Sequence, residues 1–301
     1  MNGNSMSLFR RQALMLFPFI ALVAACTTGT PEGAAVSTPS PTPSPAAAPT
    51  TPAPTPVATT ASPSPRPTPT WVVGASPLPL QANGFGEVLP TPLALRDRHL
   101  QAADVLPPPS DGRFHWTSSP ISSAIRDRMG ETYKAGCPVA LSDLRYVTLV
   151  FRGFDGGAHT GELVVKATAV PRFVAAFQRL FTLGFPIEEM RLPGTKDMNE
   201  KPTGDGNDTA SFVCRPARGQ TRFSAHAYGL AVDVNPFQNP YVKGDLVLPE
   251  LASAYRDRTW KRDGMFLRGS AALHAFTDNG FTWGGTFSRP KDYQHMTLTG
   301  N

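Results

Sequence analysis

A histidine and an aspartate lie seven positions apart in the stretch FSAHAYGLAVDVNPF, residues 223–237, and both side chains can bind a metal. Small and apolar residues separate His226 from Asp233, and Gly229 permits a sharp turn between them. A turn followed by a strand can bring the two side chains to one point. Asp233 stands between two valines, where a carboxylate is costly unless it is paired or bound to a metal. On this fragment alone, a buried aspartate satisfied by backbone amides is an equally good interpretation.

A second pair of such residues, Asp292 and His295, lies three positions apart in the stretch KDYQHM. This spacing places both side chains on one face of a helical turn, whereas on a flat strand they would face opposite sides. A histidine can bind a metal while a neighbouring carboxylate acts as a general base toward water. By itself, an acid three positions before a histidine is common by chance.

Together the two fragments resemble the zinc D-alanyl-D-alanine carboxypeptidase family of peptidoglycan peptidases. That family includes the D-Ala-D-Ala dipeptidases of vancomycin resistance and the L-alanoyl-D-glutamate endolysins of phages. The shared pattern is S-x-H-x-x-G-x-A-x-D followed much later by acid-x-x-His, and it is carried here by Ser224, His226, Gly229, Ala231, Asp233, Asp292 and His295. The stretch GFTWGG, residues 280–285, is also similar to this family. The resemblance covers about residues 130–300 and implies the zinc peptidase fold that hedgehog domains and D,D-peptidases share.

The resemblance implies a complete catalytic metal site. His226, Asp233 and His295 would bind one zinc ion, and Asp292 would be the general base. Two histidines and one carboxylate form a donor set that suits zinc without any thiolate.

The resemblance also implies residues that contact the substrate. Ser224 would hydrogen-bond the substrate, and an upstream arginine would stabilise the developing oxyanion or hold the peptide. Arg215 is our candidate because it lies just before the first motif, and Arg222 is the second choice. We expect Tyr228 and Trp283 to wall the substrate groove, although aromatic residues belong to the core equally often.

The remaining histidines have simpler interpretations. His99 and His115 lie in a proline-rich segment, and His274 lies in a predicted amphipathic helix. His159, with Glu162 close by in GGAHTGE, could line the cleft, but we expect it to be a hydrogen-bonded histidine of a hairpin.

The N-terminal segment has the layout of a secretory signal. Arg10 and Arg11 precede a short apolar run, residues 13–25, and the ending LVAAC resembles a bacterial lipobox. We expect residues 1–25 to be a lipoprotein signal peptide and Cys26 to carry the lipid. The lipid would tether the protein to the outer face of the cytoplasmic membrane. An uncleaved anchor is the alternative, although a spanning helix needs about 20 apolar residues.

The composition divides the rest of the chain into three parts. Residues 26–70 are almost entirely Pro, Thr, Ser and Ala, which predicts a disordered spacer that can reach on the order of 100 Å. Residues 71–117 are rich in proline but also carry apolar residues, so we expect an irregular arm that packs on the domain. Residues 118–301 have the size of one domain.

Within that domain, hydrophobic periodicity predicts the secondary structure. We expect helices in SSAIRDRMGE, VPRFVAAFQRLFTLGF and SAALHAFTDNGF, and strands in LRYVTLVFRGF, TGELVVKATAV, PIEEMRL, LAVDVNP and HMTLT. Residues 193–208 are polar and contain glycine, so we expect a loop that shapes the substrate pocket. This order predicts an α+β fold with a mostly antiparallel sheet and flanking helices.

The two cysteines of the predicted domain are Cys137 and Cys214. Disulfides persist in exported proteins, so we expect these two residues to pair. Two buried free thiols are the alternative.

These expectations describe a monomeric, lipid-anchored zinc peptidase that hydrolyses an amide bond in peptidoglycan stem peptides. The bond would be that of a D,D-carboxypeptidase or of an L-Ala-D-Glu-type endopeptidase. The net charge of +5 falls to +3 (28 − 2 = 26 basic against 23 acidic residues) if Arg10 and Arg11 leave with the signal peptide. This modest charge, without a basic stripe, argues little for nucleic acid as a partner. The alternative is a non-catalytic, zinc-stabilised module of the same fold that binds the wall or a partner. Asp292 discriminates between the two, because a binding module needs no base.

Overall fold

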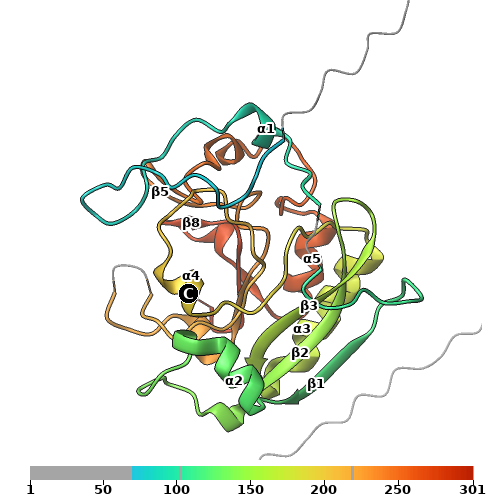
Figure 1. Cartoon of the computed structure of the whole chain (residues 1–301). Helices are drawn as coiled ribbons and strands as arrows, with labels where there is room; N and C mark the ends of the chain where they lie inside the picture. The colour runs from blue at the N-terminus through green and yellow to red at the C-terminus, as the bar shows by residue number, and fades with distance from the viewer. Residues whose placement is uncertain (1–69, 102–103, 218–219, 301) are drawn as a thin grey trace, which may run out of the picture. The chain divides into compact units, whose positions relative to one another are not determined.

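Figure 1 shows the computed structural model of the chain, which describes residues 70–101, 104–217 and 220–300. The predicted signal peptide, the predicted lipidation site Cys26 and almost all of the predicted spacer lie outside the described residues. Within the described ranges, no helix is long and apolar enough to cross a membrane.

The described residues form short helices and strands in mixed order. The helices are α1 (Leu93–Arg96), α2 (Ser123–Met129), α3 (Val170–Thr182), α4 (Thr195–Asn199) and α5 (Ala271–Thr277). The strands are β1 (Trp116–Pro120), β2 (Leu144–Arg152), β3 (Ala158–Lys166), β4 (Ala231–Asp233), β5 (Tyr241–Lys243), β6 (Leu246–Leu248), β7 (Thr282–Trp283), β8 (Lys291–Asp292) and β9 (His295–Thr297). This confirms the predicted α+β class.

The strands pair as three antiparallel sheets of three strands each, which corrects the expectation of one main sheet. The sheets have the orders β1-β2-β3, β4-β9-β7 and β6-β5-β8. Only β2 and β3 are long, and they pair along their whole length, as Figure 1 shows at the lower right. The other two sheets contain strands of two or three residues, which are too short to show a clear sequence periodicity.

The longest helix, α3, forms where the periodicity predicts it. Its buried side chains recur at helical spacing and include Phe173, Phe177 and Leu180. Pro171 lies in the first turn, where a proline is tolerated, and Gly184 follows the end with a φ of 67°. Helix α3 thus buries one apolar stripe against β2, β3 and α5.

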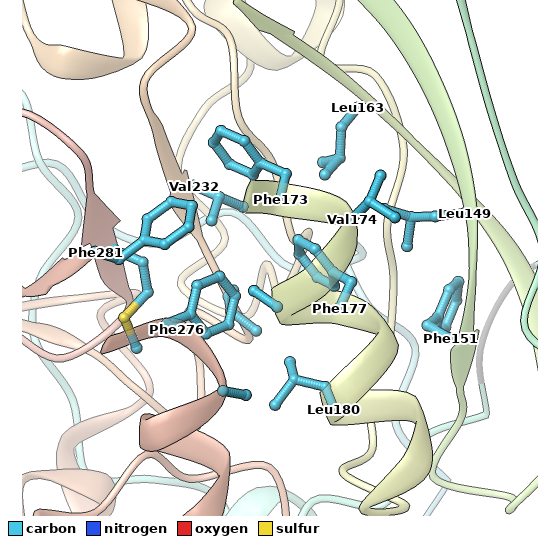
Figure 2. Packing of buried hydrophobic residues seen from close by; sticks show 14 of the residues in the cluster. Leu149, Phe151, Leu163, Phe173, Val174, Phe177, Leu180, Val232, Phe276 and Phe281 are labelled. Carbon is cyan, nitrogen blue, oxygen red and sulfur yellow. The ribbon is translucent and has the colours of Figure 1, made fainter. Parts of the chain in front are cut away.

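Aromatic side chains fill the main core between α3 and α5, as Figure 2 shows. The ring centroids of Phe177 and Phe276 are 5.5 Å apart, and those of Phe173 and Phe281 are 5.0 Å apart. Val232 of β4 joins the same cluster. The core therefore fixes the strand that carries Asp233.

Two local predictions are wrong. PIEEMRL forms no strand; it makes only isolated bridges, from Pro186 to Arg152 and from Glu189 to Asp208. Residues 193–208 are not loop throughout, because they contain α4, which begins at Thr195. The Gly194 backbone N–H caps this helix by donating a hydrogen bond to the carboxylate of Asp197.

The proline-rich arm packs on the domain, as its apolar residues indicate. Leu78 and Leu95 are buried in a cluster with Leu251, and Trp71 Nε1 donates a hydrogen bond of 2.8 Å to Asp205. The boundary predicted between residues 117 and 118 falls inside β1, whose residues pair with β2. The described arm belongs to the same compact unit as the domain.

A buried ion pair joins the arm to the domain. Arg98 is 1% exposed, and its Nε lies 2.7 Å from Glu188 Oε2. Its Nη1 donates to the carbonyl oxygen of Asp205, and Asn207 Nδ2 donates to the same carboxylate of Glu188. Each charged group of this pair is hydrogen-bonded, so the pair is tolerated in the interior. Removal of either partner would leave the other as a buried, uncompensated charge.

We predict that Arg98→Met lowers the free energy of unfolding by about 3–5 kcal/mol, since it leaves the Glu188 carboxylate buried without its partner. Chemical denaturation followed by circular dichroism measures this change. The matched control is Arg96→Met, because Arg96 is exposed and lies two residues away. A loss below about 1 kcal/mol in Arg98→Met would contradict the buried pair.

Candidate metal centre

The pairing of β4 with β9 brings two of the predicted ligands side by side. Asp233 pairs directly with His295 in the antiparallel register, so their side chains lie on the same face. The preceding pair, Val232 and Met296, faces the opposite side and is fully buried in the core. Strand alternation thus separates an apolar face from a polar one.

The third predicted ligand, His226, comes from a 3₁₀ helix, Ala225–Tyr228. Ser224 caps this helix, since its hydroxyl accepts a hydrogen bond from the His226 backbone N–H. Gly229 ends the helix with a φ of 66°, and its carbonyl oxygen accepts from the Lys166 N–H of β3. A Cβ at Gly229 would lie 2.6 Å from that nitrogen, so glycine is required there.

One ligand atom from each of the three residues converges on one point. The ligand atoms of His226, Asp233 and His295 all lie within 4.8 Å of one another. His226 Nε2 is 3.2 Å from Asp233 Oδ1 and 3.1 Å from His295 Nδ1, and His295 Nδ1 is 3.0 Å from Asp233 Oδ1. Ligands bound at about 2.0–2.2 Å in a tetrahedral zinc site are separated by about 3.3–3.5 Å. The distances between the three ligand atoms therefore fit a zinc ion if the atoms move slightly apart.

The tautomer of His226 supports a cation at this point. Its Nδ1 lies 2.5 Å from the carbonyl oxygen of Ser211, which can only accept, so Nδ1 carries the proton. In the neutral ring, Nε2 then presents a lone pair toward the carboxylate of Asp233. Lone pairs that face each other at this distance require a proton or a metal ion between them. A backbone carbonyl behind a metal-binding histidine is a common outer contact.

The charges in the cluster favour an ionised aspartate. Burial would raise the pKa of Asp233, but the charge and hydrogen bond of His226 and the hydrogen bond of His295 hold it far below its ordinary value. Burial lowers the pKa of His295, yet Asp233 raises it by more, so the net shift is upward. Asp233 therefore supplies a negative charge that attracts a cation.

Asp292 reaches the site through a tight turn and not through a helix, which corrects the predicted helical spacing. Asp292 ends β8, His295 begins β9, and the turn residues Tyr293 and Gln294 lie between them. The two strands belong to different sheets. The turn is held because Trp283 Nε1 donates a 2.7 Å hydrogen bond to the carbonyl oxygen of Tyr293.

The Asp292 carboxylate is poised to exchange a proton. Its Oδ1 is buried and, within the described part of the chain, has no hydrogen-bond partner. Burial, together with the negative charge of Asp233, raises the pKa of Asp292 to about 6. A carboxylate with a pKa near neutrality suits a general base that later acts as an acid.

A glycine leaves the space that Asp292 occupies. A Cβ at Gly284 would overlap the carbonyl oxygen of Asp292 and lie 2.9 Å from its Cβ. Gly284 belongs to the GFTWGG stretch, and the close approach gives a physical reason for a glycine there.

We predict that Gly284→Ala lowers kcat by at least about tenfold while zinc remains bound, because the new methyl group displaces Asp292 and misplacement of about 1 Å can cost about 100-fold. Kinetics together with metal analysis test this. Gly206→Ala is the matched control, since nothing lies within 4 Å of a Cβ at Gly206. An unchanged kcat in Gly284→Ala would show that Asp292 tolerates the shift.

A cavity of about 650 Å³ opens onto the three ligand atoms. It is lined by Asp233 and by described residues from three segments, which lie within 215–217 and 220–228, 241–243 and 287–300. None of the residues 193–208 lines it, so the prediction that this loop shapes the pocket is wrong. That segment instead contacts the arm through Asp205 and the 3₁₀ helix Gly130–Thr132, which follows α2, through Thr195.

Both candidate arginines line the cavity, from the two sides of one hairpin. The Arg215 carbonyl oxygen accepts from the Ser224 N–H, and the Arg222 carbonyl oxygen accepts from the Ala217 N–H. Arg215 is half-buried and its charge lowers the pKa of His295, whereas Arg222 is exposed. Of the two arginines, Arg215 is therefore the one whose charge acts on a predicted metal ligand, His295.

The predicted disulfide between Cys137 and Cys214 is present. Cys214 is 1% exposed, and its backbone N–H donates to the carbonyl oxygen of Thr132. The bond and this contact hold the backbone immediately before Arg215.

The predicted substrate-contacting residues divide into two groups. Ser224 and Tyr228 line the cavity, but the Ser224 hydroxyl also caps the helix of His226. Trp283 does not line the cavity; it is 4% exposed and packs in the core. The prediction that Trp283 walls the groove is wrong, because its indole is used to hold the turn between Asp292 and His295.

His159 and Glu162 have structural partners away from the cavity. His159 contacts Asp104 and Asp155, at 2.8 and 3.1 Å. Glu162 is fully buried and accepts from Arg128 and from the Tyr146 hydroxyl. The structural interpretation of His159 is thus the correct one.

Sequence reasoning missed several residues of the site. Ser211 contributes through its carbonyl oxygen, which no side-chain pattern reveals. Tyr241, Lys243, Phe287 and Arg289 line the cavity, and their short segments carry no motif. For these residues the only signal in the sequence is the alternation of Tyr241, Val242 and Lys243, which indicates that Tyr241 and Lys243 share one face of a strand.

The comparison with known families agrees with the motifs. A family model described as D-alanyl-D-alanine carboxypeptidase matches residues 218–298, about a quarter of the chain. The matched stretch contains the three predicted ligands and Asp292, while Arg215 lies just before it. The predicted resemblance to this family is therefore confirmed, and the match supports a peptidase. No curated protein and no solved structure matches the chain significantly.

Proposed function

We propose that this protein is a zinc metallopeptidase that hydrolyses an amide bond in peptidoglycan stem peptides. The observation that carries the proposal is the convergence of His226 Nε2, Asp233 Oδ1 and His295 Nδ1 in one cavity with the Asp292 carboxylate, whose Oδ1 has no hydrogen-bond partner among the described residues. A non-catalytic metal site has no use for a buried carboxylate with a free lone pair. The family match supports a peptidase independently of this geometry.

Zinc is the metal that fits the three ligands. When bound, it would polarise the scissile carbonyl group and lower the pKa of a water molecule. The protein's part is to hold two neutral imidazoles and one carboxylate in place, and the Ser211 carbonyl oxygen fixes the tautomer of His226.

Asp292 is the proton carrier of the proposed reaction. Its carboxylate accepts a proton from the attacking water and donates that proton to the leaving amine. The raised pKa supports both steps, since neither the acid nor the base form is strongly disfavoured near neutral pH.

Arg215 is the proposed electrostatic partner of the substrate. It lines the same cavity and carries a permanent positive charge. A guanidinium group there would stabilise the negative charge that develops on the carbonyl oxygen in the transition state, or hold the peptide.

The proposed location follows from the N-terminal sequence. A lipid on Cys26 and a proline-rich spacer would hold the domain outside the cytoplasmic membrane, within reach of the cell wall. We propose that the protein acts there as a monomer on stem peptides. The cleaved bond would be the terminal D-Ala-D-Ala link or the L-Ala-D-Glu link.

Digestion of purified peptidoglycan and of short stem peptides by the full chain in detergent tests the proposal. Reactions with zinc and with a chelator are compared, and mass spectrometry identifies the products. We expect zinc-dependent release of one product, which also names the bond. Absence of cleavage by a protein that carries one zinc per chain would refute the enzyme and favour the binding module.

A further inference from the structure

The cavity around the metal centre carries more positive than negative charge. Among its described lining residues, the cationic ones are Arg215, Arg222, Lys243 and Arg289, and the carboxylates are Asp233 and Asp292. Both carboxylates are already engaged, one as a predicted ligand and one as the predicted base. Cationic side chains that line a cavity raise the local concentration of anionic ligands.

The pairing of β5 with β8 directs Lys243 into this cavity. Tyr241 pairs with Asp292 and Val242 pairs with Lys291 in the antiparallel register. Alternate residues share a face, so Lys243 lies on the face of Tyr241 and Asp292, and all three line the cavity. Lys243 lies two residues after Tyr241, the partner of Asp292, and two residues of a strand span about 7 Å.

Arg289 lines the same cavity from the segment that leads into β8. Val242, next to Lys243, pairs with Lys291, and Arg289 lies two residues before Lys291. Lys243, Arg289 and Pro290 all line the cavity. Two cations therefore line the cavity from β5 and from the segment that leads into β8, and neither belongs to the hairpin that carries Arg215.

These two cations have no structural task among the described residues. Both are exposed, and neither side chain makes a hydrogen bond or an ion pair within the described ranges. The contrast is Lys291, on the other face of β8, whose Nζ donates to the carbonyl oxygen of Phe287 at 2.6 Å. Lys291 thus serves the fold, whereas Lys243 and Arg289 are available to a ligand.

We propose that Lys243 and Arg289 form a subsite that binds a free carboxylate of the substrate within about two residues of the cleaved amide. This inference rests on the proposed function, because the base Asp292 sets the position of the cleaved bond. The spacing of about 7 Å along β5 corresponds to about two residues of an extended peptide. The carboxylate can be the C-terminal one or a side-chain one, and the subsite selects peptides in which it is not amidated.

Three forms of one synthetic stem pentapeptide, L-Ala-γ-D-Glu-L-Lys-D-Ala-D-Ala, test the subsite. One form has both carboxylates free, one has a C-terminal carboxamide, and one has the D-Glu α-carboxylate converted to a carboxamide. We expect the full chain to lose roughly 10- to 100-fold in kcat/KM, mainly through KM, on one of the two amidated forms. The form that is affected identifies the source of the carboxylate.

Variants assign the discrimination to the two cations. We expect Lys243→Met or Arg289→Met to reduce the ratio between free and amidated peptide to within about threefold, and Lys243→Arg to retain it. Lys261→Met is the matched control, since Lys261 is an exposed lysine outside the cavity. Equal cleavage of all three forms by the unmodified chain, or full discrimination by Lys243→Met, would overturn the inference.

Calorimetric titration separates failure of this inference from failure of the proposed function. The three peptides are titrated into the zinc-loaded full chain and into Lys243→Met under the same conditions, with Asp292→Asn replacing the unmodified chain where hydrolysis interferes. A preference for the free carboxylate that depends on Lys243 supports the subsite even if no peptide is cleaved. Equal binding of free and amidated peptides contradicts it, whatever the hydrolytic activity.

Discussion

Asp292→Asn is expected to keep zinc at one ion per chain and to lose about 100- to 10,000-fold in kcat. The amide cannot accept the proton of the attacking water, but it has nearly the same size as the carboxylate and leaves His226, Asp233 and His295 in place. Because Asp292 Oδ1 has no hydrogen-bond partner among the described residues, the substitution breaks no structural contact of that atom.

Metal analysis and steady-state kinetics on the product of the digestion assay measure both effects. Asp245→Asn is a suitable control, since Asp245 is exposed and lies outside the cavity. A variant Asp292→Asn that turns over within about threefold of the unmodified protein would falsify the assignment of the base.

The second large effect is expected for His226→Ala, which removes one of three ligands. We expect zinc affinity to fall by more than roughly 100-fold, since the loss of outer-shell partners alone costs about 10- to 100-fold. The Ser211 carbonyl oxygen also loses its donor. Hydrolysis should disappear together with the metal.

Zinc-dependent stability provides a readout that does not need a substrate. A free zinc concentration 100 times the dissociation constant stabilises the folded protein by about 2.7 kcal/mol. The unmodified protein should show this gain, and His226→Ala should show almost none at the same zinc concentration. His274→Ala is the control, because His274 is exposed on α5. One zinc per chain in His226→Ala would mean that the ligand set is different.

The two variants together distinguish an enzyme from a binding module. If zinc supports only the fold, His226→Ala should weaken peptide binding and Asp292→Asn should change nothing. If the protein is a peptidase, Asp292→Asn should bind stem peptides and leave them intact. The disposition of Asp292 beside the ligands favours the second outcome.

The chemistry of the site could be predicted from the sequence because ligand identity is a property of residue type. Histidine and aspartate are residue types that can bind a metal, and the first and second motifs together, through their family resemblance, predict the ligand set. The long elements, β2, β3 and α3, could be predicted for a similar reason, since each carries a hydrophobic pattern that extends over nine or more residues. The disulfide could be predicted by counting the cysteines of a domain that the N-terminal sequence predicts to be exported.

The geometry around the site could not be predicted, because it depends on contacts between distant segments. Asp292 and His295 meet through a two-residue turn between strands of different sheets, and the spacing of three was equally compatible with a helix. Trp283 holds that turn through its indole N–H, a role that a tryptophan in sequence does not reveal.

The sequence by itself determined which atoms can bind the metal and which carboxylate can act as a base. Only the tertiary structure decided what else faces them. Residues 193–208 lie away from the cavity, whereas Lys243 faces it because β5 pairs with β8 in a register that alternates its side chains. Strands of two or three residues form because of the strands they pair with and not because of their own sequence. The residues that line the cavity, and with them the substrate preference, therefore depend on the folded chain.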